Sequence, residues 1–152
     1  MVFLMSIDDV DIAILRLLQK NCRLPLQEIA KHVGKSPGTV NYRIKRLFSL
    51  GVLKNCIAVI DREKLGFEYN VIIMVRIKPN MLGKLEEFLG ERREVLMAYA
   101  VTGHYDICMV AVFRNEKHYL EFMETLHGTG YVTETTTFVV VKRIKESLEA
   151  PI

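Results

Sequence analysis

Apolar side chains recur every three or four positions at the start of the chain, which is the spacing of one face of an α-helix. The first such stretch spans residues 8–20 and holds Val10, Ala13, Ile14, Leu17 and Leu18, with Asp8, Asp9 and Asp11 near its N-terminus. A second takes Pro25 into its first turn and ends at Gly34, a natural helix cap. A third begins at Ser36, a capping residue, followed by Pro37. Two short helices joined by a glycine turn predict a helix-turn-helix.

The third helix has an apolar stripe and a polar face. Val40, Ile44 and Leu47 form the stripe. The polar face suits the major groove of DNA, because Lys and Arg reach phosphates or guanine edges and Asn pairs with adenine. With the preceding turn and one earlier arginine, the predicted DNA contacts are Arg23, Lys35, Ser36, Pro37, Gly38, Thr39, Asn41, Tyr42, Arg43, Lys45 and Arg46. The alternative is an ordinary solvated helix face.

From residue 70 the apolar positions change from helical spacing to the alternation of strands. Strands are predicted over 70–78, 95–102, 106–113 and 132–144, with helices over about 80–90 and after Asn115. This βαββαβ order predicts a ferredoxin-like antiparallel sheet with both helices on one side. Residues 52–60, rich in β-branched types, predict a further strand that serves as a wing of the DNA-binding domain or as a tether.

These elements predict an α+β protein in three parts. A winged-helix-like helix-turn-helix domain occupies residues 1–52, a strand and linker occupy 53–68, and a ferredoxin-like domain for effector binding and oligomerisation occupies 69–152. Both alternating sets of positions in the first three strands of that domain are largely apolar, so the sheet face without helices needs a cover. A second copy of the chain, packed sheet to sheet in a homodimer, is expected to supply it.

The charge of the chain differs between its two halves. Residues 1–66 carry 11 Lys/Arg and 6 Asp/Glu, a net charge of +5, whereas residues 67–152 carry 10 and 12, a net charge of −2. Residues 23–54 hold seven cations and a single acid, Glu28. A local excess of +6 in a helical segment favours a polyanion such as double-stranded DNA, and a solvated surface is the other interpretation.

Composition excludes several classes of protein. Of the 152 residues, 50% are hydrophobic and 26% are charged, which is typical of a globular chain with a core. No apolar run approaches the roughly 20 residues that span a bilayer, and residues 2–4 are too short a run for a signal peptide, so we expect a cytoplasmic protein without membrane contacts. Cys22, Cys56 and Cys108 are odd in number and far apart, which predicts reduced, buried thiols, no disulfide framework, no metal site and no cofactor.

The motifs of the chain, in their order, resemble those of the leucine-responsive and asparagine-synthetase-regulator (Lrp/AsnC) family of bacterial and archaeal transcription regulators. The resemblance covers nearly the whole chain and rests on Ile7-Asp8-Asp9-Val10-Asp11, Glu28-Ile29-Ala30, Ser36-Pro37-Gly38-Thr39-Val40, Gly51-Val52-Leu53 and Thr102-Gly103-His104-Tyr105-Asp106. It implies a DNA-binding domain, a regulatory domain, dimers that gather into octamers, and an amino-acid effector bound between subunits. Two departures are Pro25, where many members have serine, and Lys54-Asn55-Cys56, which replaces a glycine-aromatic pair.

The turn at Gly103 resembles the glycine-to-aspartate effector loop of that family. Its backbone N–H groups suit an α-carboxylate, and the Asp106 carboxylate suits an α-ammonium group. A threonine row on the last strand lines either a pocket or the solvent side of an edge strand. The predicted effector residues are Thr102, Gly103, His104, Tyr105, Asp106, Thr133 and Thr135. The alternative role of Asp106 is to hold a tight turn by local hydrogen bonds.

Two other functions remain open at this point. Some relatives of the fold decarboxylate a tetrapyrrole, and His104 is the most plausible member of a catalytic pair, although the four histidines show no metal-ligand spacing. A protein that organises DNA with little sequence preference would bind random and operator DNA alike. The basic helix-turn-helix favours a sequence-specific transcriptional regulator over an enzyme.

Overall fold

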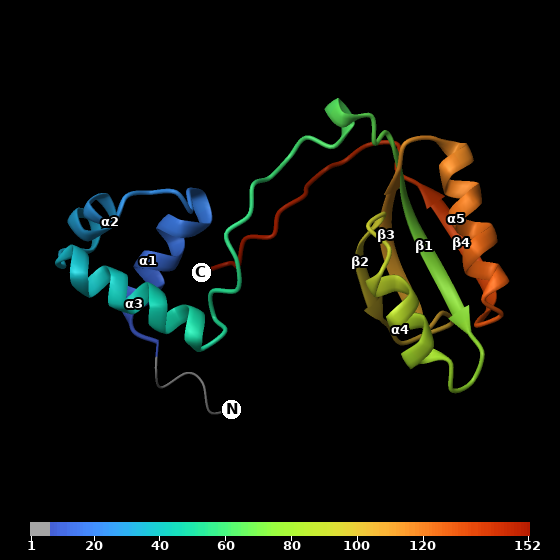
Figure 1. Ribbon diagram of the computed structural model, residues 1–152, viewed down its shortest axis with the longest axis horizontal. Helices are drawn as coiled ribbons and strands as arrows, with labels where there is room; N and C mark the ends of the chain where they lie inside the picture. The colour runs from blue at the N-terminus through green and yellow to red at the C-terminus, as the bar shows by residue number, and fades with distance from the viewer. Residues whose placement is uncertain (1–6) are drawn as a thin grey trace. The chain divides into compact units, whose positions relative to one another are not determined.

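A computed structural model describes residues 7–152 of the chain and divides it into two compact units (Figure 1). The first unit holds the chain up to Val59 together with the C-terminal tail, Ser147–Ile152. The second unit is Ile60–Glu146. The tail is held in the first unit by Gln19, whose side chain accepts a hydrogen bond from the Ala150 N–H at 2.6 Å and donates one to the Ala150 carbonyl at 3.3 Å. Two segments of chain therefore connect the units.

The first unit is built from the three predicted helices, which are confirmed as α1 (Asp9–Lys20), α2 (Leu26–Val33) and α3 (Pro37–Ser49). Their apolar stripes meet in one core, in which Ile14, Ile29, Val40 and Leu47 are fully buried. Ser36 caps α3 as predicted and accepts a hydrogen bond from the Thr39 N–H, and Asp8, predicted to lie near the N-terminus of the first helix, caps α1 by accepting one from the Asp11 N–H. The prediction that Pro25 lies in the first turn of the second helix was wrong. Its ψ of 144° is not helical, so Pro25 precedes α2 as the N-cap.

The strand predicted over residues 52–60 is absent from the part of the chain that the structure describes. Leu53 still packs on the helical core, but residues 54–60 form no helix or strand and make no backbone-to-backbone hydrogen bond with residues 7–152. Their β-branched side chains are exposed, Val59 to 95%. The prediction was wrong for a physical reason: a strand needs a neighbouring strand to satisfy its backbone groups, and a single copy of the chain supplies none here.

The second unit has the predicted βαββαβ order. After a 3-10 turn at Glu63–Leu65, its elements are β1 (Tyr69–Ile77), α4 (Leu82–Gly90), β2 (Val95–Ala100), β3 (Ile107–Phe113), α5 (Glu116–Gly128) and β4 (Val132–Val139). The strands form one antiparallel sheet in the order β2-β3-β1-β4, which confirms the ferredoxin-like fold. The last strand was predicted to reach residue 144 but ends at Val139, which pairs with Val71 near the start of β1, so later residues have little strand left to pair with.

The two faces of this sheet differ in what covers them. On one face, side chains of β1 and β3 such as Ile73, Met109 and Phe113 pack against Leu85 of α4 and Leu126 of α5 and are fully buried. The alternate positions point to the other face, which neither helix covers. Register pairs on that open face join Ile72 with Val110, Met74 with Cys108, Met97 with Val110, Tyr99 with Cys108, and Ile72 with Phe138. The expectation of a sheet that is apolar on both faces is confirmed.

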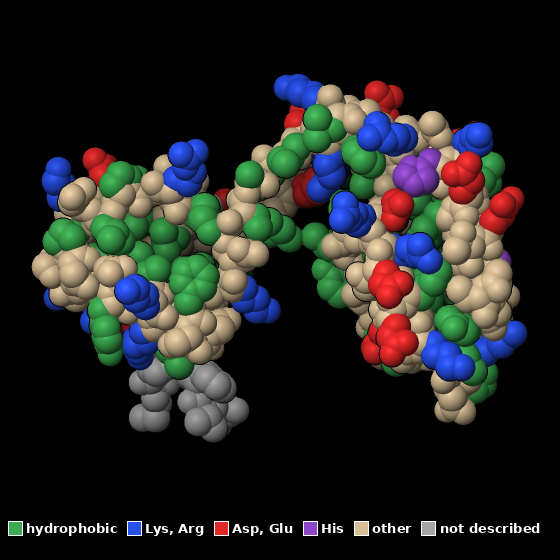
Figure 2. All heavy atoms as spheres, viewed as in Figure 1, with side chains coloured by type: hydrophobic (Ala, Val, Ile, Leu, Met, Phe, Trp, Pro, Cys, Tyr) green, Lys and Arg blue, Asp and Glu red, His purple; other side chains and the backbone are tan. Residues whose placement is uncertain are grey.

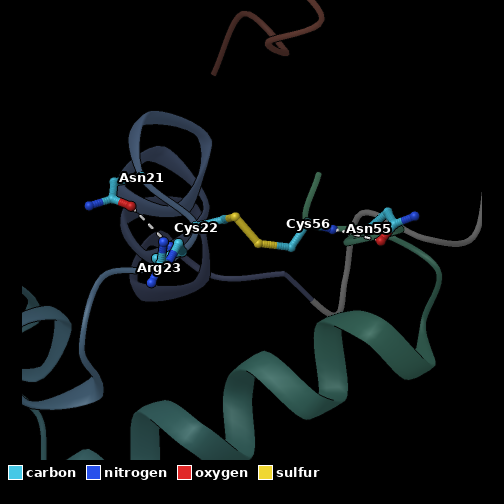
Figure 3. The surroundings of a disulfide bond; sticks show 5 residues. All are labelled: Asn21, Cys22, Arg23, Asn55 and Cys56. Atoms are coloured by element: carbon cyan, nitrogen blue, oxygen red, sulfur yellow. Dashed lines mark hydrogen bonds between the residues drawn. A yellow bond between two sulfur atoms is a disulfide. The ribbon is translucent and has the colours of Figure 1, made fainter. Parts of the chain in front are cut away.

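Cysteine pairing is the clearest departure from the sequence analysis. Cys22, in the turn after α1, and Cys56, in the segment after α3, form a disulfide with Cα atoms 5.9 Å apart (Figure 3). Cys56 is exposed, and only Cys108 is a free thiol, half-buried on the open face of the sheet. The prediction of reduced, buried thiols was wrong for Cys22 and Cys56, because a separation of 34 residues along the chain gave no sign that the fold brings them together.

No helix in the described ranges is both long and apolar enough to cross a membrane.

Candidate nucleic-acid interface and effector loop

Helix α3 presents its polar face to solvent because its apolar stripe is anchored in the helical core. Gly34 ends α2 in the left-handed conformation, with φ of 64°, and lets the chain turn within three residues into α3. Ser36 then accepts a hydrogen bond from the Thr39 N–H at 3.1 Å. Tyr42 is 68% exposed. The predicted contacts that lie exposed along this turn and face are Lys35, Ser36, Pro37, Gly38, Thr39, Tyr42 and Lys45.

Two arginines of the predicted interface are held by acids of α1. Arg43 Nη1 lies 2.7 Å from each carboxylate oxygen of Asp8 and 2.8 Å from Asp11 Oδ1, and Arg46 Nη1 lies 3.1 Å from Asp11 Oδ2. Asp11 is fully buried. The hydrogen bond from Arg43 holds the pKa of Asp8 below its usual value, and hydrogen bonds to Asp8 and Asp11 raise the pKa of Arg43. This ion-pair cluster joins α1 to α3 and fixes the orientation of both arginines.

The remaining cations of the basic segment make no ion pair with any residue that the structure describes. They are all exposed, and Figure 2 shows Lys and Arg side chains on the visible surface of this unit. Lys31, one of the seven cations of residues 23–54 but not among the predicted DNA contacts, lines, with Lys35, Ser36 and Thr39, an open hollow at the turn between α2 and α3. It lies one helical turn before Lys35. The cations without an ion pair are Arg23, Lys31, Lys35, Lys45 and Lys54. Asn41 is half-buried.

The loop between β2 and β3 is fastened to the sheet by Asp106. Its carboxylate Oδ2 accepts a hydrogen bond from the Ile77 N–H at 2.8 Å, and its N–H donates to the Val75 carbonyl at 2.9 Å. The Val101 N–H donates to the Asp106 carbonyl at 2.9 Å, which closes the loop. Inside it, Gly103 has φ of 123°, a conformation that favours glycine. The N–H groups of residues 102–105 make no hydrogen bond with residues 7–152.

The polar partners of this loop on β4 are not the predicted threonines. His104 Nε2 lies 3.3 Å from Glu134 Oε2, and the Tyr105 hydroxyl lies 3.3 Å from Glu134 Oε1 and 2.5 Å from Thr136 Oγ1. Glu134 was missed, although strand alternation places it with Thr136 on the face opposite Thr135.

The predicted threonines bind elsewhere. Thr133 Oγ1 donates to the Arg76 carbonyl at 3.2 Å, and Thr135 Oγ1 lies 3.1 Å from His127 Nε2. Thr137 Oγ1 accepts from the Tyr119 hydroxyl at 2.7 Å. Thr135 and Thr137 thus contact α5, and the structure does not bring Thr133 and Thr135 onto the loop side with His104 and Tyr105.

Metal ligands do not gather in the described ranges, where no group of three or more His, Cys, Asp or Glu residues could hold an ion. His118 Nε2 lies 3.3 Å from a single carboxylate, that of Glu94.

Comparison with known proteins matches two family models to the chain. Residues 7–47 match the AsnC-type helix-turn-helix domain, and residues 70–150 match the Lrp/AsnC ligand-binding domain. An HTH-type transcriptional regulator of Pyrococcus furiosus is 34% identical over 142 residues, 93% of this chain and 96% of its own. The HTH-type transcriptional regulator FL11 of Pyrococcus abyssi is 31% identical over 147 residues, 97% of each chain.

Solved structures of two regulators superpose on nearly the whole chain. The transcriptional regulator NMB0573 of Neisseria meningitidis, solved as a complex with L-Met, superposes with a TM-score of 0.91 at 28% identity, over 96% of this chain and 97% of its own. An AsnC family transcriptional regulator of Agrobacterium tumefaciens superposes with a TM-score of 0.88 at 25% identity, over 95% and 97%. The chain belongs to the Lrp/AsnC family of transcriptional regulators.

Proposed function

We propose that this regulator reads a specific operator by placing α3 in the major groove of DNA. The observation that carries the proposal is the exposed polar face of α3 and its preceding turn, where Lys35 and Lys45 have no ion-pair partner among residues 7–152. Their charges are available to phosphates, and Thr39 and Tyr42 offer hydroxyls beside them. Gly38 leaves its side of the helix open, since a Cβ there would meet only Ser36 Oγ at 3.9 Å.

Arg43 and Arg46 act in this proposal as positioned contacts. Arg43 makes all three of its contacts with Asp8 and Asp11 through Nη1, which anchors that end of the guanidinium group. A fixed guanidinium loses less side-chain freedom when it meets a phosphate or a guanine. Asp11 is thus proposed to hold Arg43 and Arg46 in position before DNA binds.

Selection from a pool of random DNA duplexes tests the reading of sequence. A dimer should enrich a pseudo-palindrome with half-sites about 10 bp apart, or multiples of that spacing. A protein that organises DNA without sequence preference would bind the enriched and the random duplexes alike at one salt concentration, and that result would reject the proposal.

Replacing Lys35 and Lys45 together by alanine should weaken binding to the enriched duplex by about tenfold or more, and should reduce the slope of log affinity against log salt by about two. Neither lysine is needed for the fold, because both are exposed and make no ion pair with the described part of the chain. Titration by fluorescence anisotropy at several salt concentrations measures both quantities. Lys117→Ala, exposed on α5 of the other unit, is the matched control and should change neither. Unchanged affinity in the double variant would remove α3 from the interface.

We also propose that the open sheet face joins two copies of the chain into a homodimer. Half-buried Ile72, Met74 and Val110 lie beside exposed Tyr99 and Phe138 on this face. An apolar surface continuous over four strands is typical of an interface, and the same surface on a second copy is its simplest complement. Two linked α3 helices then read the two half-sites.

For the effector, we propose an amino acid at the loop of residues 102–105. The neighbour from Neisseria meningitidis is a complex with L-Met, which supports this class of ligand. The unpaired N–H groups of the loop suit its carboxylate, and Glu134, next to His104 and Tyr105, suits its ammonium group better than Asp106, whose carboxylate already accepts from Ile77. His104 is in this proposal a binding residue and not a catalytic one.

Glu134→Gln should weaken binding of the sensed amino acid by about tenfold or more, because it removes the charge of a charge-assisted hydrogen bond. Isothermal titration with each proteinogenic amino acid identifies the ligand, and repetition on the variant measures the loss. Glu121→Gln, exposed on α5, is the control. If Glu134→Gln binds the amino acid as tightly as the unmodified chain and a folded Asp106→Ala variant does not bind it, Asp106 and not Glu134 contacts the ammonium group.

A further inference from the structure

The disulfide between Cys22 and Cys56 closes a loop of the chain that contains both helices of the helix-turn-helix. Cys22 follows α1, Cys56 lies beyond α3, and the 34 residues of separation contain both α2 and α3 (Figure 3). Each cysteine has an asparagine before it: Asn21 Oδ1 accepts from the Arg23 N–H at 3.0 Å, and Asn55 Oδ1 accepts from the Cys56 N–H at 2.8 Å. The bond therefore links two short, locally hydrogen-bonded segments that are remote in sequence.

This bond fixes the point at which the linker leaves the first unit. Beyond Leu53 the linker makes no backbone-to-backbone hydrogen bond with residues 7–152 until the turn after Asp61, and Ile57 to Ile60 are exposed. With the disulfide formed, the free tether to the second unit begins at Ile57; with it reduced, the tether begins at Lys54. The free length of this linker, which is one of the two segments that connect the units, thus depends on the oxidation state of two side chains.

We propose that Cys22 and Cys56 are a thiol-redox modification site that controls the DNA-binding unit through its linker. Exposure of Cys56 admits small thiols and disulfides, while Cys22 is half-buried. Lys20 and Arg23 near Cys22, and Lys54 near Cys56, favour the reactive thiolates. A low-molecular-weight disulfide such as glutathione disulfide is the oxidant.

The exchange is balanced in two steps. A thiolate of one cysteine attacks the small disulfide, forms a mixed disulfide and releases one small thiolate; the thiolate of the other cysteine then attacks the mixed disulfide, forms the Cys22–Cys56 bond and releases the second. The two protons lost by the cysteines end on the two released thiols. Excess small thiol reverses both steps.

The consequence rests on the proposed dimeric DNA reader. A short tether restricts the distance between the two α3 helices, whereas a longer one lets the second helix reach half-sites at other spacings, because the effective concentration of a tethered site depends on tether length. The oxidised protein should therefore discriminate between half-site spacings more strongly than the reduced protein. Contacts of α3 with a single half-site should not change.

The test compares the full chain treated with glutathione disulfide and with dithiothreitol. Mass spectrometry after alkylation should find only Cys108 labelled in the first case and all three cysteines in the second. Hydrogen exchange at residues 54–60 should be faster in the reduced protein. Labelled duplexes carry two enriched half-sites at one turn or at one and a half turns. The longer spacing should cost the oxidised protein about tenfold more affinity than it costs the reduced protein.

The variant Cys22→Ser/Cys56→Ser, which keeps Cys108, should behave like the reduced protein under both treatments. Cys22 and Cys56 that remain labelled after glutathione disulfide would overturn the proposal, as would equal spacing preference in both redox states or a redox response of the double variant. A protein that binds no duplex would reject the proposed function instead. In that case hydrogen exchange alone tests the redox site. Faster exchange at residues 54–60 in the reduced protein than in the oxidised protein, with no such difference in the double variant, supports the site. Equal exchange in the two redox states overturns it.

Discussion

Asp11→Asn should lower the free energy of unfolding of the helical unit by about 3 kcal/mol. The Asp11 carboxylate is fully buried and accepts three hydrogen bonds, from the Asp8 N–H at 3.2 Å, from Arg43 and from Arg46. Two of these donors are charged, and an asparagine amide would turn an N–H₂ group toward one of them. Because whole domains are stable by only about 5–15 kcal/mol, a loss of this size is a large share.

Urea unfolding followed by helical circular dichroism, with hydrogen exchange to separate the two units, measures this loss. Asp9→Asn is the matched control, because Asp9 lies in the same first turn of α1 but is exposed, and it should change stability by less than about 0.5 kcal/mol. Equal stability of the two variants would mean that the cluster of Asp8, Asp11, Arg43 and Arg46 does not hold α1 to α3.

The same variant separates two roles of the arginines. If Asp11 only stabilises the fold, folded Asp11→Asn at low temperature binds DNA as the unmodified chain does. If it also orients Arg43 and Arg46, as we propose, affinity for the enriched duplex falls by several-fold while affinity for random duplex is retained, since phosphates tolerate a mobile guanidinium better than base edges do.

Local signals in the sequence predicted the elements well. Ser36 and Asn115 each cap the helix that they were expected to begin, Asp8 caps the helix at whose N-terminus it was expected to lie, and all three caps act within three residues of chain. Alternation in β1 also follows from the chain itself, because Val71, Ile73 and Val75 must share one face. Features that depend on neighbours in sequence were therefore accessible without a structure.

Features that depend on remote partners were not accessible in the same way. The β-branched run before Asp61 has strand propensity but no strand beside it, and β4 stops near the start of β1, where little strand is left to pair with. The Cys22–Cys56 bond needs the linker to return to the turn after α1. None of these follows from spacing along the chain, since each is decided by which segments meet in space.

Part of the candidate site could nevertheless be predicted from the sequence. Asp11 occupies the same helical stripe as Ile14 and Leu18, and a carboxylate on an apolar stripe needs a cation, which α3 supplies. The projection of α3 placed Arg46 on the outer face because it treated the helix alone. Glu134 was not predicted for a similar reason: the predicted threonines share one face of β4, whereas Tyr105 contacts Glu134 and Thr136 on the other.

Val110→Lys should convert the proposed dimer into monomers. Val110 lies in the middle of the open sheet face, opposite Ile72 on one side and Met97 on the other. In one copy the new side chain can extend into solvent, because Val110 is only half-buried, so the fold should survive. In a symmetric dimer one substitution places two unpaired ammonium groups in the interface, and each costs several kcal/mol to desolvate.

The dissociation constant of the dimer should therefore rise by about a thousandfold or more, which sedimentation equilibrium measures directly. Leu120→Lys is the matched control: Leu120 is 50% exposed on α5, in the helical layer on the other side of the sheet, and the variant should remain as dimeric as the unmodified chain. A monomeric Val110→Lys protein should also lose spacing preference between half-sites, because a single α3 reads each half-site independently. An unchanged mass for a folded Val110→Lys protein would show that another surface joins the copies, and the open face of the sheet would then need a different cover.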